Sequence, residues 1–108
     1  SRIAAPEGKT SPEELLAAAH AGCLTMSLAG ELTQAGTPPT RLDVKCTIVM
    51  DEVADEGHQI IASHATIAVA ADGADEEALA GAIERAEAGC PFSTLLRKAG
   101  AEVTVSRS

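Results

Sequence analysis

Two cysteines stand where a thiol could do chemistry. Cys23 lies within a run of alanine and glycine residues, and Cys90 stands directly before Pro91. Pro91 suits the first position of a helix, which puts Cys90 at the N-cap, where unpaired backbone N–H groups and the helix dipole favour a thiolate. Cys23 is expected in mid-helix, without that help. If Cys23 reacts, a cation must come from elsewhere, and Arg2 is the natural candidate.

The cysteines also have a plain structural interpretation. Cysteine is among the most buried residue types, and we keep that interpretation for Cys46, on the apolar face of a predicted strand. His20 precedes Cys23 by three residues, so the two share a helix face and, with Cys90 nearby, suggest zinc. No further Cys or His stands at short spacing to complete a tetrahedral set, so we expect no metal.

A long helix predicted over Ser11–Gly36 must carry the first cysteine. Ser11 is a good N-cap, Pro12 suits the first helical position, and Glu14 completes a capping box. Apolar and small residues recur along it with helical spacing, and a glycine followed by two prolines supplies the end. A helix of about 23 residues is roughly 35 Å long, enough to cross a small domain.

The rest of the chain predicts a hairpin, two helices and a last strand. In chain order, the elements are the strand Arg41–Val53, the strand Gln59–Ala70, the helix Asp75–Ala88, a short helix from Pro91 to Gly100, and the strand Ala101–Ser106. The inward residues expected on the second strand are Ile61, Ala65, Ile67 and Val69. Because helices and strands do not alternate, the class is α+β, with the long helix on a mainly antiparallel sheet.

Composition narrows the class of protein. The net charge of −8 argues against nucleic acid and anionic membrane surfaces as partners, because both require clustered basic residues. We expect no membrane span, since no apolar run approaches about 18 residues, and no signal peptide. Three sparsely spaced cysteines indicate reduced thiols, so we expect a cytoplasmic protein. We expect residues 1–108 to form a single domain, with no internal linker.

Two segments carry a resemblance to a known family. KTSPEELLAAAHAGCLTMSLAGELTQAG, the later AEAGCPFSTLL and the strand pattern between them resemble the OsmC/Ohr family, the osmotically inducible and organic-hydroperoxide-resistance peroxidases. The resemblance covers nearly the whole chain, and PEELLAAAHAGC, with His20, is similar to the OsmC branch. It implies an OsmC-like fold in an intertwined homodimer. Members of the family carry further N-terminal strands, so we expect residues 1–108 to lack that part of the domain.

The resemblance implies a thiol peroxidase, an antioxidant enzyme linked to osmotic stress. Cys23 would attack an organic hydroperoxide, or hydrogen peroxide, and Cys90 would resolve the sulfenic acid as a disulfide. By motif position, Glu13 and Arg2 would orient and activate the Cys23 thiolate. The resemblance implies a lipoyl or small-thiol reductant and no cofactor. A second thiol that condenses with the sulfenic acid protects it from over-oxidation, which suits this chemistry independently.

The spacing of Glu13 and Cys23 predicts how two copies would pair. Ten residues on one helix separate them by about 15 Å along the axis, too far for one chain to bring them together. Two copies of the helix crossing antiparallel near Ala18 would place residue 13 of one chain level with residue 23 of the other. The small residues over 17–22 allow that close crossing. We therefore expect an obligate homodimer with both active sites at its interface.

Two other classes of function remain open at this point. One is a non-catalytic, stress-related or ligand-binding protein of the same fold, in which the thiols are incidental. The other is a small zinc-binding module built on His20 and the cysteines. Neither cysteine has an identifiable Ser–His–Asp or Cys–His–Asn set around it, so hydrolase chemistry has no support.

Overall fold

The long helix α1 (Pro12–Gln34) lies where the sequence signals predict it. In the computed structural model, which describes residues 11–55 and 57–108, both hydrogen bonds of the capping box are present. The Ser11 hydroxyl accepts from the Glu14 backbone N–H at 3.2 Å, and the Glu14 carboxylate accepts from the Ser11 backbone N–H at 3.0 Å. At the other end, Gly36 takes the left-handed conformation, with φ of 83°, that lets the chain leave the helix.

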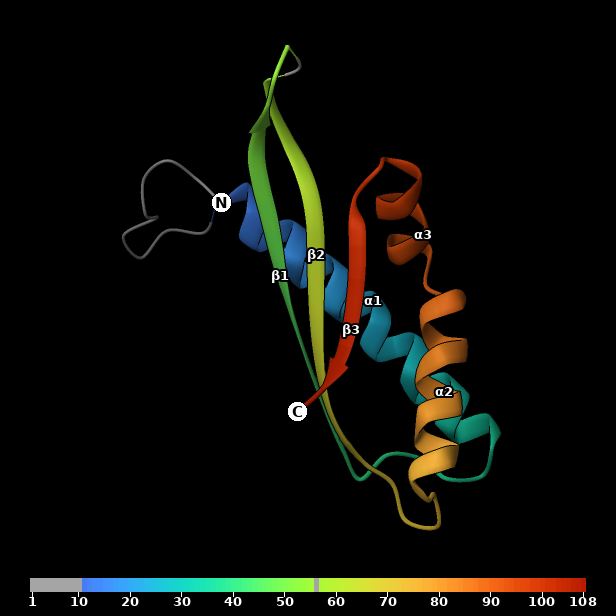
Figure 1. Ribbon diagram of the computed structural model, residues 1–108. Helices are drawn as coiled ribbons and strands as arrows, with labels where there is room; N and C mark the ends of the chain where they lie inside the picture. The colour runs from blue at the N-terminus through green and yellow to red at the C-terminus, as the bar shows by residue number, and fades with distance from the viewer. Residues whose placement is uncertain (1–10, 56) are drawn as a thin grey trace.

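Three strands form one mixed sheet in the order β1–β2–β3 (Figure 1). Strands β1 (Arg41–Val53) and β2 (Gly57–Ala70) pair antiparallel, as the hairpin predicts. Strand β3 (Glu102–Arg107) pairs parallel with β2, so the expectation of a mainly antiparallel sheet misses this edge. The helices α2 (Glu76–Ala88) and α3 (Pro91–Lys98) carry the chain back before β3, which allows the parallel pairing.

A β-bulge makes one inward residue of the prediction wrong. Val49 pairs with Ala62, but Met50 pairs with Ile60, so Ile61 is an extra residue on its strand. Its side chain is 36 % exposed instead of buried. The three later residues of the predicted inward set are buried or packed against the core. Alternation along a strand therefore fails where the register changes.

All three helices contact one another, and α1 crosses one face of the sheet (Figure 1). The core between α1, α2 and the sheet is made of small and aliphatic side chains together with two cysteines. Its buried members are Leu24, Leu28, Leu32, Cys46, Ala65, Ile67, Leu79, Ala82, Ala86 and Cys90. Two of the three thiols are therefore part of the packed interior.

Among the described residues, α1 is the one helix long and apolar enough to cross a membrane by length and composition. The expectation that no segment approaches that length was therefore wrong. The core helix of a soluble protein passes the same test. Here α1 packs three fully or almost fully buried leucines into the core and carries His20, whose side chain is fully buried.

Candidate active site

The thiols of Cys23 and Cys90 lie next to each other. Cys23 is half-buried on α1, and Cys90 is fully buried at the N-cap of α3. The side chain of Cys90 is within hydrogen-bonding reach of the Cys23 sulfur. Both thiols are free. The structure thus brings together the two cysteines that the sequence singles out.

The start of α3 faces Cys23. Cys90 makes no side-chain hydrogen bond to its own helix, and Pro91 has no N–H to offer. The backbone N–H of Phe92, in the first turn of α3, instead donates to the Cys23 sulfur. The prediction that Cys23 lacks help from a helix N-terminus was therefore wrong. That prediction considered only the helix that carries Cys23.

Opposing influences act on the Cys23 thiol. Burial raises its pKa above the ordinary value, the Phe92 N–H lowers it, and the neighbouring Cys90 thiol raises it. The net direction is upward, toward the neutral thiol. A nucleophilic thiolate at this position would need a nearby positive charge, in addition to the Phe92 N–H, to lower the pKa of Cys23.

His20 is fully buried on α1, one turn before Cys23. Its Nδ1 is 2.7 Å from the Ser63 hydroxyl of β2, and its Nε2 is 2.8 Å from the Ser93 hydroxyl of α3. Both ring nitrogens therefore face serine hydroxyls and not a metal site. Within residues 11–55 and 57–108, no group of three or more His, Cys, Asp or Glu side chains could hold a metal ion.

Two further interactions hold the segment that carries Cys90. The Ser27 hydroxyl of α1 donates to the Ala86 carbonyl of α2 at 2.8 Å. Arg97 of α3 pairs with Glu87 of α2 at 2.7 Å, and the Glu87 side chain is only 13 % exposed. The α2–α3 connection is thus fixed on both sides of Cys90.

Cys46 is a core residue, as expected. Burial raises the pKa of its thiol to about 11, the neighbouring Cys90 also raises it, and a hydrogen bond from Ser63 lowers it. At neutral pH only about one Cys46 in ten thousand would be ionised, because four pH units separate pH 7 from that pKa. Cys46 is therefore poorly suited to act as a nucleophile.

The raised pKa of Cys46 predicts a loss of stability in alkali. The folded state keeps this proton up to about pH 11, whereas the unfolded chain releases it near 9.0, so stability falls as pH rises between those values. We expect the unfolding free energy of the wild type to fall by about 3 kcal/mol more than that of Cys46→Ala over this range. Urea unfolding of both proteins at a series of pH values measures the difference. Parallel curves would contradict it.

Glu13 is buried on α1, with 8 % of the residue exposed. Its Oε2 has no hydrogen-bond partner among the residues that the structure describes. A buried carboxylate oxygen without a partner is costly. Arg2, the predicted activating cation, lies outside the described residues.

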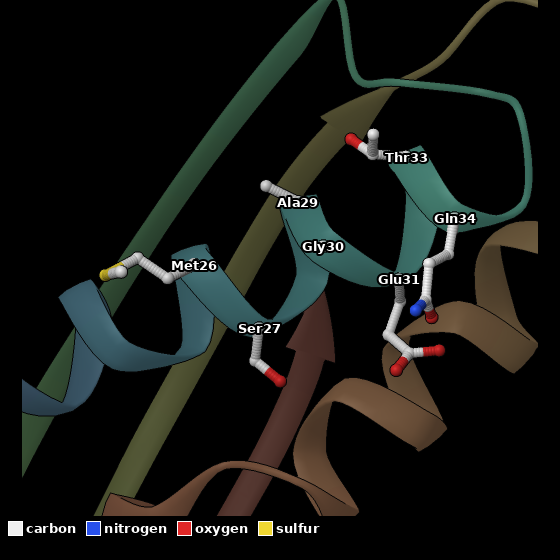
Figure 2. Close-up of a pocket in the computed structure, with 7 residues that line it drawn as sticks. All are labelled: Met26, Ser27, Ala29, Gly30, Glu31, Thr33 and Gln34. Carbon is white, nitrogen blue, oxygen red and sulfur yellow. The ribbon is translucent and has the colours of Figure 1, made fainter.

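The outer face of α1 is open and apolar. Leu15 is 62 % exposed and Met26 is 77 % exposed, and a Cβ added at Gly22 or Gly30 would meet no atom within 4 Å. A pocket along the second half of this helix includes neither thiol of the candidate site. Figure 2 shows Met26 projecting from the helix on this stretch, away from the side where Ser27 reaches α2.

Comparison with known proteins gives one family and a shared fold. The family model described as "OsmC-like protein" matches residues 5–106. "Peroxiredoxin OsmC" of Escherichia coli is 40% identical over 99 residues, which are 92% of this chain and 66% of that protein. The chain thus spans slightly less than two thirds of the length of that relative.

Two solved structures are similar in fold. An organic hydroperoxide resistance protein OsmC from Legionella pneumophila superposes with a TM-score of 0.81 at 19% identity, over 94% of this chain and 71% of that one. An organic hydroperoxide resistance protein from Elizabethkingia anophelis gives a TM-score of 0.76 at 24% identity, over 94% and 69% of the two chains. At such identities the likeness supports the shared fold.

Proposed function

Because this chain belongs to the OsmC-like protein family, we propose that it is a cysteine peroxidase that reduces organic hydroperoxides, and hydrogen peroxide less specifically. The adjacent thiols of Cys23 and Cys90 are the observation that carries this proposal. Two thiols in contact can pass from the reduced pair to a disulfide without a large rearrangement. The name of the Escherichia coli relative, a peroxiredoxin, supports the same chemistry.

The proposed reaction proceeds in three steps. The Cys23 thiolate attacks a peroxide oxygen, the O–O bond breaks, and the departing alkoxide takes a proton to leave as an alcohol. Cys23 is then a sulfenic acid, and the Cys90 sulfur attacks it, forming the disulfide while water leaves. A dihydrolipoyl dithiol, or two molecules of a small thiol, returns two electrons, restores both thiols and is itself oxidised to a disulfide. These steps need no metal or organic cofactor.

Each group around Cys23 has a proposed role. The Phe92 N–H stabilises negative charge on the sulfur, both in the thiolate and while the O–O bond breaks. Arg2 supplies the positive charge that lowers the pKa of Cys23, against the burial that raises it. The small residues around Cys23 on α1 leave room for the alkyl group of a hydroperoxide. We propose that the enzyme works in the cytoplasm, where thiol reductants are available.

We further propose that the working enzyme is an intertwined homodimer. The open apolar face of α1, with exposed Leu15 and Met26 around two unhindered glycines, suits a close helix crossing. Glu13 supports the same arrangement, because its buried Oε2 lacks a partner among the described residues. In the dimer, Glu13 of one chain would orient groups around Cys23 of the other.

Anaerobic thiol titration tests the proposed function. One equivalent of cumene hydroperoxide added to the reduced protein is expected to remove two of its three thiols, because one turnover ends in a disulfide. Counting thiols in denaturant before and after peroxide, with the disulfide located by mass spectrometry, gives the result. Cys46→Ala serves as the matched control. It has two thiols, Cys23 and Cys90, and should lose both. Unchanged thiols would indicate a non-catalytic, ligand-binding protein.

A further inference from the structure

The buried ring of His20 connects three elements at one point. It lies on α1 one turn before Cys23, and its two nitrogens contact Ser63 of β2 and Ser93 of α3. The side chains of all three partners are fully buried. Buried polar groups of this kind are costly unless satisfied, so the two hydrogen bonds strongly fix where each element sits.

One of these contacts lies beside the candidate site. Ser93 follows Phe92 directly, and the Phe92 N–H is the group that donates to the Cys23 sulfur. Cys90 is three residues before Ser93, at the N-cap of the same helix. A helix of eight residues is too short to be stable by its own hydrogen bonds. The position of α3 therefore depends on its contacts with the rest of the chain.

Another polar anchor of α3 is at its far end. Arg97, in the last turn, pairs with Glu87, and its side chain is 45 % exposed. This partly buried ion pair holds the last turn of α3 to α2, seven residues after Cys90, and does not reach the first turn. The contact between His20 and Ser93 is therefore a fully buried side-chain anchor for the first turn of α3, next to the Phe92 N–H that faces Cys23.

We propose that His20 is a positioning residue, whose hydrogen bond to Ser93 holds the first turn of α3 so that the Phe92 N–H and the Cys90 thiol stay on Cys23. This inference rests on the proposed peroxidase function, in which these two groups serve the thiolate and the sulfenic acid. His20 has no direct role at either sulfur in this proposal. It acts through the backbone of α3.

Burial of the ring favours its neutral form. Burial lowers the pKa of His20, the Glu87 carboxylate of α2 raises it, and Arg97 of α3 lowers it. Serine hydroxyls face the ring from β2 and from α3. A neutral imidazole donates from one nitrogen and accepts at the other, so one serine accepts a hydrogen bond and the other donates one.

Two serine variants separate positioning from simple packing. Ser93→Ala removes the contact with α3, and Ser63→Ala removes the contact with β2 from the same buried ring. Each leaves one ring nitrogen without its partner, so both should lower the melting temperature. Only Ser93→Ala should slow the alkylation of Cys23 by iodoacetamide at neutral pH, by about tenfold, and shift its pH midpoint up by about one unit.

A pair of histidine variants repeats the test without touching either serine. The amide of glutamine reaches about as far as Nε2, and that of asparagine about as far as Nδ1, so each keeps one of the two partners. His20→Gln should retain Cys23 reactivity within about twofold, whereas His20→Asn should lose it like Ser93→Ala. This pair keeps the inference testable if one serine variant fails to fold.

Alkylation followed site by site in the mass spectrometer reads the position of α3 without any peroxide. Failure of the proposed peroxidase function would show separately, in peroxide consumption. Equal effects of Ser63→Ala and Ser93→Ala on the Cys23 pH profile would overturn the inference. So would lowered melting temperatures with unchanged Cys23 profiles, because His20 would then be a structural residue only.

Discussion

Replacing Cys23 with serine is expected to abolish peroxide reduction, lowering the rate by roughly a thousandfold or more. A hydroxyl is a far weaker nucleophile than a thiolate and cannot form the sulfenic acid on which the later steps depend. Cys90→Ser should still consume one equivalent of hydroperoxide, since Cys23 remains. It should then stop, with Cys23 present as sulfenic acid or a more oxidised form, because the resolving thiol is missing.

Steady-state consumption of cumene hydroperoxide with dihydrolipoamide, and intact-protein mass after one equivalent, distinguish these variants. Cys46→Ser is the matched control, because its thiol is buried and has a pKa of about 11. It should turn over at nearly the wild-type rate. If Cys46→Ser stays folded yet is as inactive as Cys23→Ser, the roles assigned to the three thiols are wrong.

Mixing two inactive homodimers is expected to restore activity. Glu13→Ala lacks the carboxylate and Cys23→Ser lacks the nucleophile, but a heterodimer has one site with wild-type Cys23 from one chain and wild-type Glu13 from the other. Half of the dimers in an equal mixture are heterodimers, and half of their sites are intact. Complete subunit exchange should therefore give about one quarter of wild-type activity.

The double variant Glu13→Ala, Cys23→Ser is the control for this mixing experiment. Mixed with Glu13→Ala, it should restore nothing, because no site in any dimer then contains both groups. Exchange can be verified by native mass spectrometry of subunits of different mass. A monomer in light scattering, or proven exchange without restored activity, would contradict a dimer in which the two chains share each active site.

The fold was largely predictable from local signals. The capping box at Ser11 and the glycine at residue 36 mark the two ends of α1. They could be recognised in the sequence because these signals act through hydrogen bonds within a few residues. The parallel pairing of β3 was not predicted, since it depends on how α2 and α3 carry the chain between strands. The displacement of Ile61 was also missed, because alternation gives no sign of a bulge.

The pair of neighbouring cysteines was predictable from the sequence, but its geometry was not. Proline after Cys90 and the small residues around Cys23 marked both thiols, and the structure places them next to each other. The donation from Phe92 to Cys23 joins two helices, so no local pattern contains it. The contacts of His20 with Ser63 and Ser93 were missed, although Ser63 on an inward strand position is a polar residue among apolar ones and was a usable signal.

The unequal burial of the two thiols determines how their disulfide would be opened. Cys90 is fully buried and Cys23 is partly exposed, so an incoming thiolate would reach the sulfur of Cys23 more readily. The mixed disulfide would therefore form on α1, with Cys90 as the leaving group. Access, and not the relative acidity of the two sulfurs, would set that regiochemistry. A slender or unfolded dithiol would then be a better electron donor than a folded protein with a recessed thiol.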